Sequence, residues 1–366
     1  MRFPEFEGEW EVKKLGEILK VGSGRDYKHL KEGNIPVFGT GGYMTSVNEF
    51  LFDGESVCIG RKGTINKPFY YNGKFWTVDT LFYTYSYKNV LPKFVFNVFE
   101  QINWLMYNEA SGVPSLSKST IEQIEISIPD ISEQQKIASF LSLIDERIAA
   151  QSKIIEGLKE LKAWLSKQLF SRKLRFKDEN GNDFPEWVET KLGEIAETYS
   201  GGTPTSTNNS YYIGNIPFIK SGEISSDKTE QFINEEALKN SSAKMVSKGD
   251  LLLALYGATS GEVAISQIAG AINQAVLVIK SMQNTNFLHH FLRCNKENII
   301  STYLQGGQGN LSAQIVKNIT INLPSLTEQK KIADFLSEID NKVEVETTTF
   351  DLLTKQKHYL LRQMFI

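Results

Sequence analysis

The sequence predicts an α+β fold in which two mixed globular units alternate with two long helices. The first observation is an internal repeat: Pro129–Ile148 (PDISEQQKIASFLSLIDERI) returns 195 positions later, without a gap, as Pro324–Val343 (PSLTEQKKIADFLSEIDNKV). The second is a heptad spacing of apolar residues along both copies, and the third is a segment of short β-like runs before each copy. A repeat that holds over this length indicates a duplicated unit.

Each copy begins with the residue types of a helix start. Ser132 and Thr327 follow a proline-containing turn and are the predicted N-caps. Glu133 and Glu328 place negative charge in the first turn, where the helix dipole favours it. We therefore predict long helices over 130–173 and 325–366.

Both helices carry apolar residues in steps of four and three, which is the spacing of a heptad seam. Polar residues interrupt the two seams at matching places, Gln151 and Lys162 in the first helix and Glu346 and Lys357 in the second. A helix of about 40 residues is roughly 60 Å long. Because that is too long for an ordinary core helix, we expect the two helices to pack on each other.

A globular segment precedes each helix. The opening FPEFEGEWEVKKLGEI from Phe3 returns as FPEWVETKLGEI from Phe184, and Trp10 and Trp187 are predicted core anchors. The predicted strands of the first segment are Ile35–Phe38, Ser56–Ile59, Phe75–Val78 and Leu81–Tyr85, followed by a helix over Lys93–Tyr107. Those of the second are Ile216–Lys220, Asp250–Tyr256, Val263–Ile265 and Ala271–Ile279, followed by a helix over Phe287–Tyr303. The predicted domains are 1–129 and 184–324, the helices 130–173 and 325–366, and the linker 174–183.

Composition narrows the class of protein. The 366 residues carry a net charge of −3, so the overall charge does not by itself indicate a protein that binds nucleic acid. No apolar run is long enough to span a membrane, and no secretory leader follows Met1. Cys58 and Cys294 have no ligand pattern nearby, which predicts reduced, buried thiols in a cytoplasmic protein. The four histidines are too scattered to predict a metal site.

Catalytic motifs are missing from the sequence. There is no phosphate-binding loop, and the run Gly39–Gly42 opens no predicted helix. There is also no Asn/Asp-Pro-Pro-aromatic segment of the kind that amino-methyltransferases use. Asp130 with Glu160 and Lys162 superficially matches a nuclease pattern, but the last two residues lie two apart on a helix and point in different directions. The sequence therefore predicts a protein without a catalytic centre of its own.

Hydrogen-bonding side chains are concentrated in the two globular segments. Lysine and arginine donate to guanine O6 and N7, and amides pair with adenine, so such side chains are candidate DNA contacts. The candidates in the first segment are Arg25, Lys28, Tyr43, Arg61, Lys62, Thr64, Lys67 and Lys74. Those in the second are Thr203, Lys220, Ser221, Tyr256, Thr259, Gln274, Gln305, Gln308 and Asn310.

With these features the chain resembles the DNA-specificity subunit (S subunit) of type I restriction-modification systems. The resemblance rests on the twin helix starts at 128–141 and 323–336 and on the twin Trp…Lys-Leu-Gly-Glu-Ile openings. Gly60-Arg61-Lys62-Gly63-Thr64 and Gly201-Gly202-Thr203-Pro204 add to it. The resemblance implies two target-recognition domains separated by two long antiparallel helices, which form a coiled-coil-like spacer with a pseudo-twofold repeat.

The same resemblance implies the function and the partners. Each domain is expected to read one half of a bipartite double-stranded DNA target, and the helices are expected to dock two methyltransferase (M) subunits. Restriction (R) subunits complete the expected complex. No cofactor is expected in this chain, because S-adenosylmethionine, ATP and magnesium belong to the partner subunits. Residues outside the seam are the expected docking set: Phe140, Leu143, Trp164, Phe170, Phe335, Tyr359 and Phe365.

Two other classes of protein stay open on the sequence alone. A two-domain scaffold that recruits proteins is favoured by the near-neutral charge, and it predicts no salt-dependent duplex binding. A self-sufficient methyltransferase or nuclease predicts that the isolated chain binds S-adenosylmethionine or a divalent metal.

Overall fold

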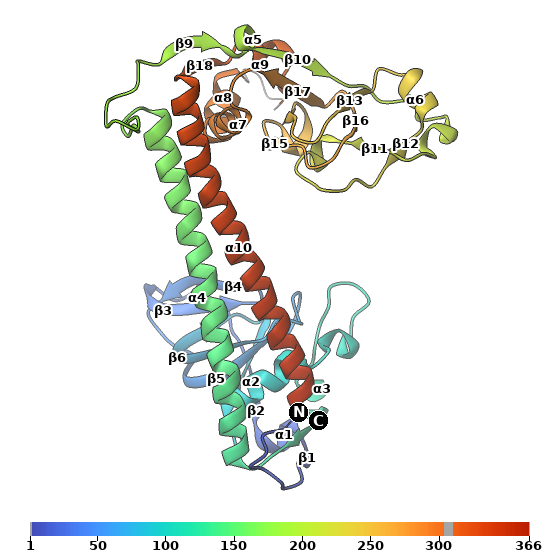
Figure 1. The fold of residues 1–366 in the computed structure, drawn as a ribbon. Helices are drawn as coiled ribbons and strands as arrows, with labels where there is room; N and C mark the ends of the chain where they lie inside the picture. The colour runs from blue at the N-terminus through green and yellow to red at the C-terminus, as the bar shows by residue number, and fades with distance from the viewer. Residues whose placement is uncertain (1, 304–309, 366) are drawn as a thin grey trace. The chain divides into compact units, whose positions relative to one another are not determined.

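A computed structural model describes residues 2–303 and 310–365 of the chain (Figure 1). It contains two compact units, one formed by residues 1–153 with 347–366 and the other by residues 154–346. Each unit holds a mixed domain and one end of each long helix. The predicted α+β class, with two mixed domains and two long helices, is confirmed.

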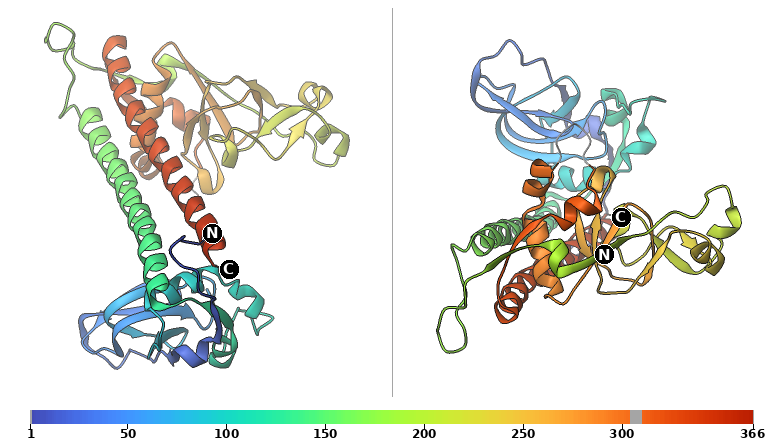
Figure 2. Two further views of the ribbon diagram at one scale, coloured as in Figure 1. Left: turned by 60° about the horizontal axis from the view of Figure 1, so that its bottom comes forward. Right: turned by 90° about the horizontal axis from the view of Figure 1, so that it is seen from above.

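The domain of the first unit is built on a six-stranded sheet. Its strand order is β2 (Lys20–Ser23), β7 (Leu81–Tyr85), β5 (Phe52–Gly60), β6 (Phe69–Thr77), β3 (Glu32–Gly39) and β4 (Gly42–Val47). Only β3 and β6 run parallel among these neighbours. The strands are rich in the aromatic and β-branched residues that suit a pleated surface. Figure 2 shows the curved sheet in blue.

Short elements complete this domain. They are β1 (Glu11–Lys14), which pairs with β8 (Glu125–Ile128), and α1 (Leu15–Ile18), α2 (Pro92–Gln101), η1 (Trp104–Tyr107) and α3 (Lys118–Gln123). The helix predicted over 93–107 is thus a helix and a separate turn, because the backbone becomes extended at Ile102. The core gathers residues of α1, α2 and the sheet, together with Leu360, Leu361 and Met364.

The domain of the second unit has two four-stranded sheets. One has the order β10 (Ala196–Ser200), β17 (Val276–Ser281), β14 (Leu251–Ala254) and β15 (Val263–Ile265), and the other β12 (Phe232–Ile233), β11 (Ile216–Ile219), β16 (Gly270–Ile272) and β13 (Lys244–Val246). The remaining strands, β9 (Val188–Lys191) and β18 (Thr320–Leu323), pair with each other. The helical elements are α5 (Leu192–Ile195), η2 (Asn209–Tyr212), η3 (Ser221–Glu223), α6 (Glu235–Lys239), η4 (Gly257–Thr259), α7 (Thr285–Cys294), α8 (Lys296–Tyr303) and α9 (Ala313–Lys317).

Two of the predicted elements in this domain are wrong in extent. The strand predicted over Ala271–Ile279 is two strands, since Asn273 accepts a hydrogen bond from the Ala275 amide and turns the chain between β16 and β17. The helix predicted over Phe287–Tyr303 breaks at Asn295, whose side-chain amide bonds back to the Phe291 carbonyl and ends α7. In both cases an asparagine side chain competes with the regular backbone pattern.

The two domains share a backbone frame although their sequences differ. The parallel pairing of β3 with β6 joins Phe38 to Thr77, and that of β11 with β16 joins Ile219 to Ile272. Thr77 and Ile272 are 195 positions apart, the same shift as in the helix repeat. The duplication therefore includes the sheets as well as the helices.

The long helices are α4 (Ile131–Phe170) and α10 (Leu326–Met364). Their N-caps are Asp130 and Ser325, which accept from the Glu133 and Glu328 amides at 2.9 and 3.3 Å. The predicted caps Ser132 and Thr327 are wrong, because the helices start at Ile131 and Leu326 and both residues lie inside the first turn.

The Glu-Gln pair of each repeat is buried rather than solvated. Glu133 accepts both ends of the Arg2 guanidinium at 2.7 and 2.6 Å, and Glu328 those of Arg175 at 3.2 and 3.0 Å. The next residue, Gln134 or Gln329, donates to the carbonyl of the proline that precedes the helix. Bidentate pairs of this kind are strong and directional, so the repeated motif serves to anchor the start of each helix.

These pairs correct the alignment of the repeat openings. Phe3 packs on Phe140 with ring centroids 5.8 Å apart, and Phe176 packs on Phe335 at 5.5 Å. Since Arg2 and Arg175 also match, Phe3 corresponds to Phe176 and not to Phe184. The second copy has extra residues before its tryptophan, and they form the turn around Asp178.

The helices run antiparallel within each unit. In the first unit Lys357, near the end of α10, lies 2.5 Å from Asp145 near the start of α4. In the second unit Lys162 of α4 donates to Asp340 of α10. Burial lowers the pKa of Lys162, and Asp340 opposes that shift. The lysine interruptions of the seam, Lys162 and Lys357, therefore form matching lysine–aspartate pairs across the helices.

Candidate nucleic-acid interface

The residues Arg61 and Lys62 stand at the end of β5, where four loops of the first domain converge. The Arg61 amide donates to the Thr80 carbonyl, and the Leu116 amide donates to the Arg61 carbonyl, both at 2.8 Å. The Arg25 amide reaches the Thr77 carbonyl at the same distance. These bonds fix the backbone of the turn, and the Arg61 and Lys62 side chains are exposed.

Glycines allow this turn to close. Gly63 has a φ of +94°, and its amide donates to the Pro114 carbonyl at 2.8 Å. A Cβ on Gly60 would lie 2.1 Å from the Thr64 carbonyl oxygen, so the strand end and the following loop approach too closely for a side chain. Thr64 thus has a backbone role in the turn.

A cavity of about 580 Å³ lies beside Arg61 and Lys62. Lys118 adds a third cation to its lining, and Asp79 and Glu109 add two carboxylates. The Arg61 guanidinium donates to the Asp79 carbonyl at 3.3 Å and lies 5.8 Å from the centroid of the Phe82 ring. This polar, mixed-charge surface offers both hydrogen-bond donors and acceptors to a ligand.

The second domain repeats the frame with other side chains. The Leu255 amide donates to the Ala275 carbonyl and the Leu311 amide to the Leu255 carbonyl, again both at 2.8 Å. Gly257, with a φ of +79°, follows the exposed Tyr256 as Gly63 follows Lys62. Thr203 donates to Gln274 at 2.6 Å, which joins two of the loops. The predicted residues Thr203, Tyr256 and Gln274 are thus brought to one place.

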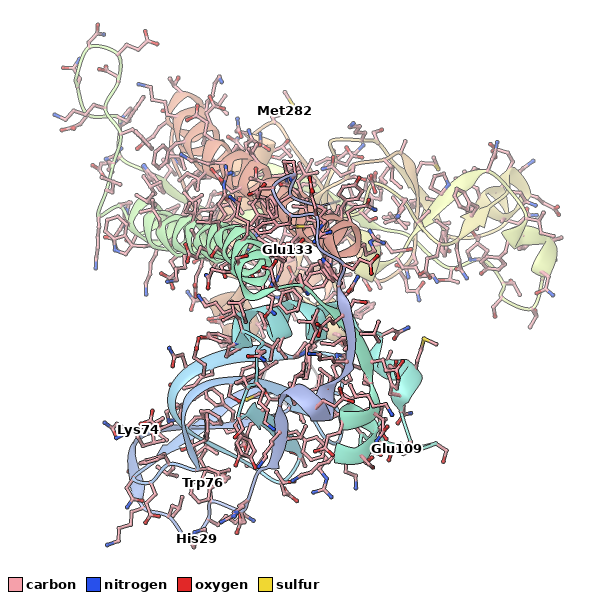
Figure 3. All side chains as sticks on the ribbon, turned by 90° about the horizontal axis from the view of Figure 1, so that it is seen from below. His29, Lys74, Trp76, Glu109, Glu133 and Met282 are labelled. Atoms are coloured by element: carbon pink, nitrogen blue, oxygen red, sulfur yellow. The ribbon has the colours of Figure 1, made fainter. Side chains whose placement is uncertain are left out.

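Other predicted contacts of the first domain lie away from the turn. Lys74 lies over the Phe50 ring at 5.0 Å, and the Tyr43 and Ser46 hydroxyls share a hydrogen bond within β4. Figure 3 shows Lys74 in the same part of the domain as Trp76 and His29, whose rings are 6.0 Å apart. Lys28 and Lys67 are exposed on loops.

Of the remaining predicted DNA contacts in the second domain, four lie in the described residues and two do not. Lys220 and Ser221 begin η3, where the Glu223 carboxylate accepts from the Lys220 amide at 3.1 Å. Thr259 ends η4, and Asn310 is exposed just before Leu311. Gln305 and Gln308 lie outside the described residues.

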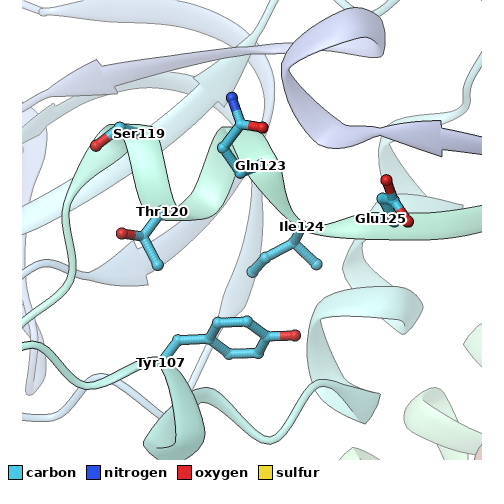
Figure 4. A pocket seen from close by; sticks show the side chains of 6 residues that line it. All are labelled: Tyr107, Ser119, Thr120, Gln123, Ile124 and Glu125. Atoms are coloured by element: carbon cyan, nitrogen blue, oxygen red, sulfur yellow. The ribbon is translucent and has the colours of Figure 1, made fainter.

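A second cavity of the first domain is shown in Figure 4. It has a volume of about 590 Å³ and is lined by Tyr107, Ser119, Thr120, Gln123, Ile124 and Glu125. None of these lining residues is cationic, so the cavity lacks the positive charge that neutralises phosphates.

The chain matches the family described as the type I restriction modification DNA specificity domain over residues 7–160 and 185–355. The chain belongs to this family. Each match covers one domain and most of the helix that follows it.

Relatives of known name agree with this membership. The type I restriction enzyme MjaVIII specificity subunit of Methanocaldococcus jannaschii is 25% identical over 408 residues, covering 99% of this chain and 92% of the relative. A putative type I restriction enzyme specificity subunit of Haemophilus influenzae is 24% identical over 341 residues, covering 88% of this chain and 85% of the relative. The crystal structure of the type I S subunit from M. genitalium shares the fold with a TM-score of 0.67 at 17% identity, covering 100% of this chain and 99% of that chain.

Specificity subunits of this family recognise DNA sequence and work in a complex with other subunits. The predicted general role in DNA recognition is therefore confirmed. Across residues 2–303 and 310–365, no helix combines the length and the apolar composition needed to cross a membrane. In the same residues, no three His, Cys, Asp or Glu side chains are grouped to hold a metal ion.

The predicted docking residues of this specificity subunit fall into three groups by exposure. Leu143, Trp164 and Tyr359 are exposed on the long helices, with 57% of Trp164 and 51% of Tyr359 accessible. Phe170 is buried between Phe287 and Phe291, at ring distances of 5.7 and 5.5 Å, so its prediction as a docking residue is wrong. Phe140, Phe335 and Phe365 are partly buried against aromatic rings of their own units.

The structure also gives the environments of three further residues, two cysteines and a histidine. Cys58 is buried as predicted, and burial raises the pKa of its thiol to about 12. Cys294 is exposed at the end of α7, so its predicted burial is wrong. His290 has its Nε2 3.1 Å from the Ser337 hydroxyl, and burial lowers the pKa of the imidazole to about 3.

Sequence reasoning missed Asp79 and Ser115 of the first domain. Asp79 lines the cavity beside Arg61, and Ser115 forms an isolated β-bridge with Lys62. The signal was present in the repeat: Gln274 and Asn310, both candidates in the second domain, lie 195 positions after them.

Proposed function

We propose that this specificity subunit binds a bipartite double-stranded DNA target, with one recognition domain for each half-site. The observation that carries the proposal is the shared loop frame of the two domains, in which Arg61 and Lys62 correspond to Leu255 and Tyr256. A common backbone frame that presents different donors and acceptors suits two readers of different sequences. The heptad helices act as the spacer between the two readers, and half-sites about one helical turn, roughly 34 Å, apart are a natural target for duplicated readers.

The proposal includes the partners. Two methyltransferase subunits dock on the long helices, and restriction subunits join the same complex. S-adenosylmethionine, ATP and magnesium act on those partners, and this chain supplies sequence recognition. The scaffold alternative is weakened by the cationic side chains Arg61, Lys62 and Lys118 at one cavity, where they outnumber the carboxylates of Asp79 and Glu109 although the net charge of the chain is −3.

The first test is methylome sequencing of cells that express this chain with a cognate methyltransferase subunit, beside cells that lack the chain. We expect a split motif with modified adenine in both halves. Replacing residues 21–110 with the recognition segment of another specificity subunit should change one half only. A stable complex that produces no new methylation would contradict the proposal and favour the scaffold.

Docking is tested separately through Trp164 and Tyr359, which occupy matching positions of the two helices. Alanine at either position should weaken binding of the methyltransferase subunit by about tenfold, because exposed aromatic residues are frequent binding hot spots. A tenfold loss corresponds to about 1.4 kcal/mol. Met282→Ala is the control, since this side chain is 93% exposed but lies outside the helices. Unchanged affinity for both aromatic variants would exclude this surface.

A further inference from the structure

One side chain in each domain stands on a backbone segment that is fixed at both ends. In the first domain the Val78 amide donates to the Phe38 carbonyl at 3.0 Å, and the Thr80 carbonyl accepts from Arg61. In the second domain the Asn273 amide donates to the Ile219 carbonyl at 3.4 Å, and the Ala275 carbonyl accepts from Leu255. The residues between these anchors are Asp79 and Gln274, both exposed.

These two positions are equivalent by chain order and by topology. Each follows the strand that pairs in parallel with its neighbour, β6 or β16, and precedes β7 or β17. The two residues are 195 positions apart, as are the helix repeats. The two domains therefore share this backbone segment, but the first presents a carboxylate on it and the second an amide.

Gln274 is oriented by a second loop. The Thr203 hydroxyl donates to Gln274 Oε1 at 2.6 Å. This loop lies tightly against the end of β16, because a Cβ on Gly201 would be 1.8 Å from the Ile272 carbonyl oxygen. The bond leaves Oε1 with further acceptor capacity and Nε2 with both of its hydrogens. Such an amide matches the N6 donor and N7 acceptor of adenine in the major groove.

Asp79 presents the opposite chemistry. Its carboxylate only accepts hydrogen bonds, and the chain beside it is held by the Arg61 guanidinium on the Asp79 carbonyl. Cytosine offers an N4 amino donor in the major groove, and aspartate accepts from it. The neighbouring cations Arg61 and Lys62 offset the repulsion between this carboxylate and DNA phosphates.

We propose that Asp79 and Gln274 are the matching specificity-determining residues of the two half-sites, with Asp79 reading a cytosine and Gln274 an adenine. Thr203 is a positioning residue that holds the Gln274 amide. This inference rests on the proposed function, because it assigns base contacts within the proposed half-sites.

The test exchanges the hydrogen-bonding groups with little change of shape. Gln274→Glu should move the preference at one position of the second half-site from adenine to cytosine. Asp79→Asn should move one position of the first half-site from cytosine to adenine. We expect each preference to change roughly tenfold to a hundredfold, the range of one bidentate base contact. Thr203→Val should keep the motif but reduce discrimination at the Gln274 position alone.

Matched controls make the same chemical changes elsewhere. The control variants are Gln267→Glu and Asp53→Asn. Gln267 lies in the turn between β15 and β16, Asp53 lies near the start of β5, and both side chains are exposed. Both controls should leave the motif unchanged. The readouts are methylome sequencing and, with the assembled methyltransferase complex, binding to duplexes that carry each of the four bases at each target position.

The outcomes separate the two proposals. A wild-type split motif with unchanged base preferences in both variants would overturn the assignment of Asp79 and Gln274 and leave the proposed function standing. A wild-type complex that methylates nothing and binds no duplex would overturn both. If a variant complex no longer methylates, the duplex series decides: a wild-type preference refutes the assignment, and a changed preference supports it.

Discussion

Arg175→Ala is expected to destabilise the second unit by about 3–5 kcal/mol, the usual cost of leaving one partner of a buried ion pair alone. Glu328 is 0% exposed, and Arg175 supplies two of its hydrogen bonds, at 3.2 and 3.0 Å. Trp187 donates a third at 3.0 Å and cannot neutralise the carboxylate. The same guanidinium also donates to the Phe184 and Pro185 carbonyls, so its removal frees the chain that enters the domain.

Chemical denaturation of the full chain, followed by hydrogen exchange in the first turns of α10, measures this effect. Lys177→Ala is the matched control, because its contact with Asp183 is 3.9 Å long and exposed on both sides. An exposed pair of that kind contributes about 0–1 kcal/mol. Arg175→Ala and Glu328→Gln together should recover part of the loss. Equal stability of Arg175→Ala and Lys177→Ala would refute the anchoring role.

Lys357→Met is expected to destabilise the first unit by a similar amount, about 3–5 kcal/mol. Lys357 is buried, and its ammonium lies 2.7 Å from Glu100 and 2.5 Å from Asp145. Methionine keeps the length of the side chain but leaves two carboxylates facing each other without a cation. Burial already raises the pKa of Glu100, and the loss of Lys357 removes the interaction that opposes this shift.

The sign of the pH dependence follows from Glu100. In the variant its folded-state pKa lies above that of the unfolded chain, so the penalty is present at neutral pH and is relieved as the pH falls through the folded pKa. The stability difference between wild type and Lys357→Met should therefore be larger at pH 7 than at pH 5. Lys355→Met, an exposed change on the same helix, is the control. A difference that does not depend on pH would contradict this account.

Local pattern in the sequence was enough to find the duplication and the long helices. The seam repeats every few residues, and the matching interruptions Lys162 and Lys357 were visible without any contact information. Strand β7 and strand β15 lie where the sequence placed them, at Leu81–Tyr85 and Val263–Ile265. The contacts that define such segments are between residues close together along the chain. The periodicity of the sequence is therefore enough to predict these elements.

Predictions that depended on partners distant in the chain were less successful. Phe170 and Trp164 look alike in sequence, yet α7 covers the first and leaves the second exposed. Asparagine side chains ended α7 and separated β16 from β17, because each had a backbone partner that propensity does not reveal. The buried roles of Glu133 and Glu328 likewise required arginines from another part of the chain.

The sequence by itself determined the α+β class, the repeated order of domains and helices, and the family resemblance. Only the tertiary structure decided which polar residues share a site, since loops far apart in the chain meet at the ends of β5 and β14. Asp79 shows the difference: the 195-residue repeat pairs it with Gln274, but only the matching hydrogen bonds of the two loops place both residues at the same point of the backbone frame. Long-range backbone hydrogen bonds establish that equivalence, and they leave no periodic trace in the sequence.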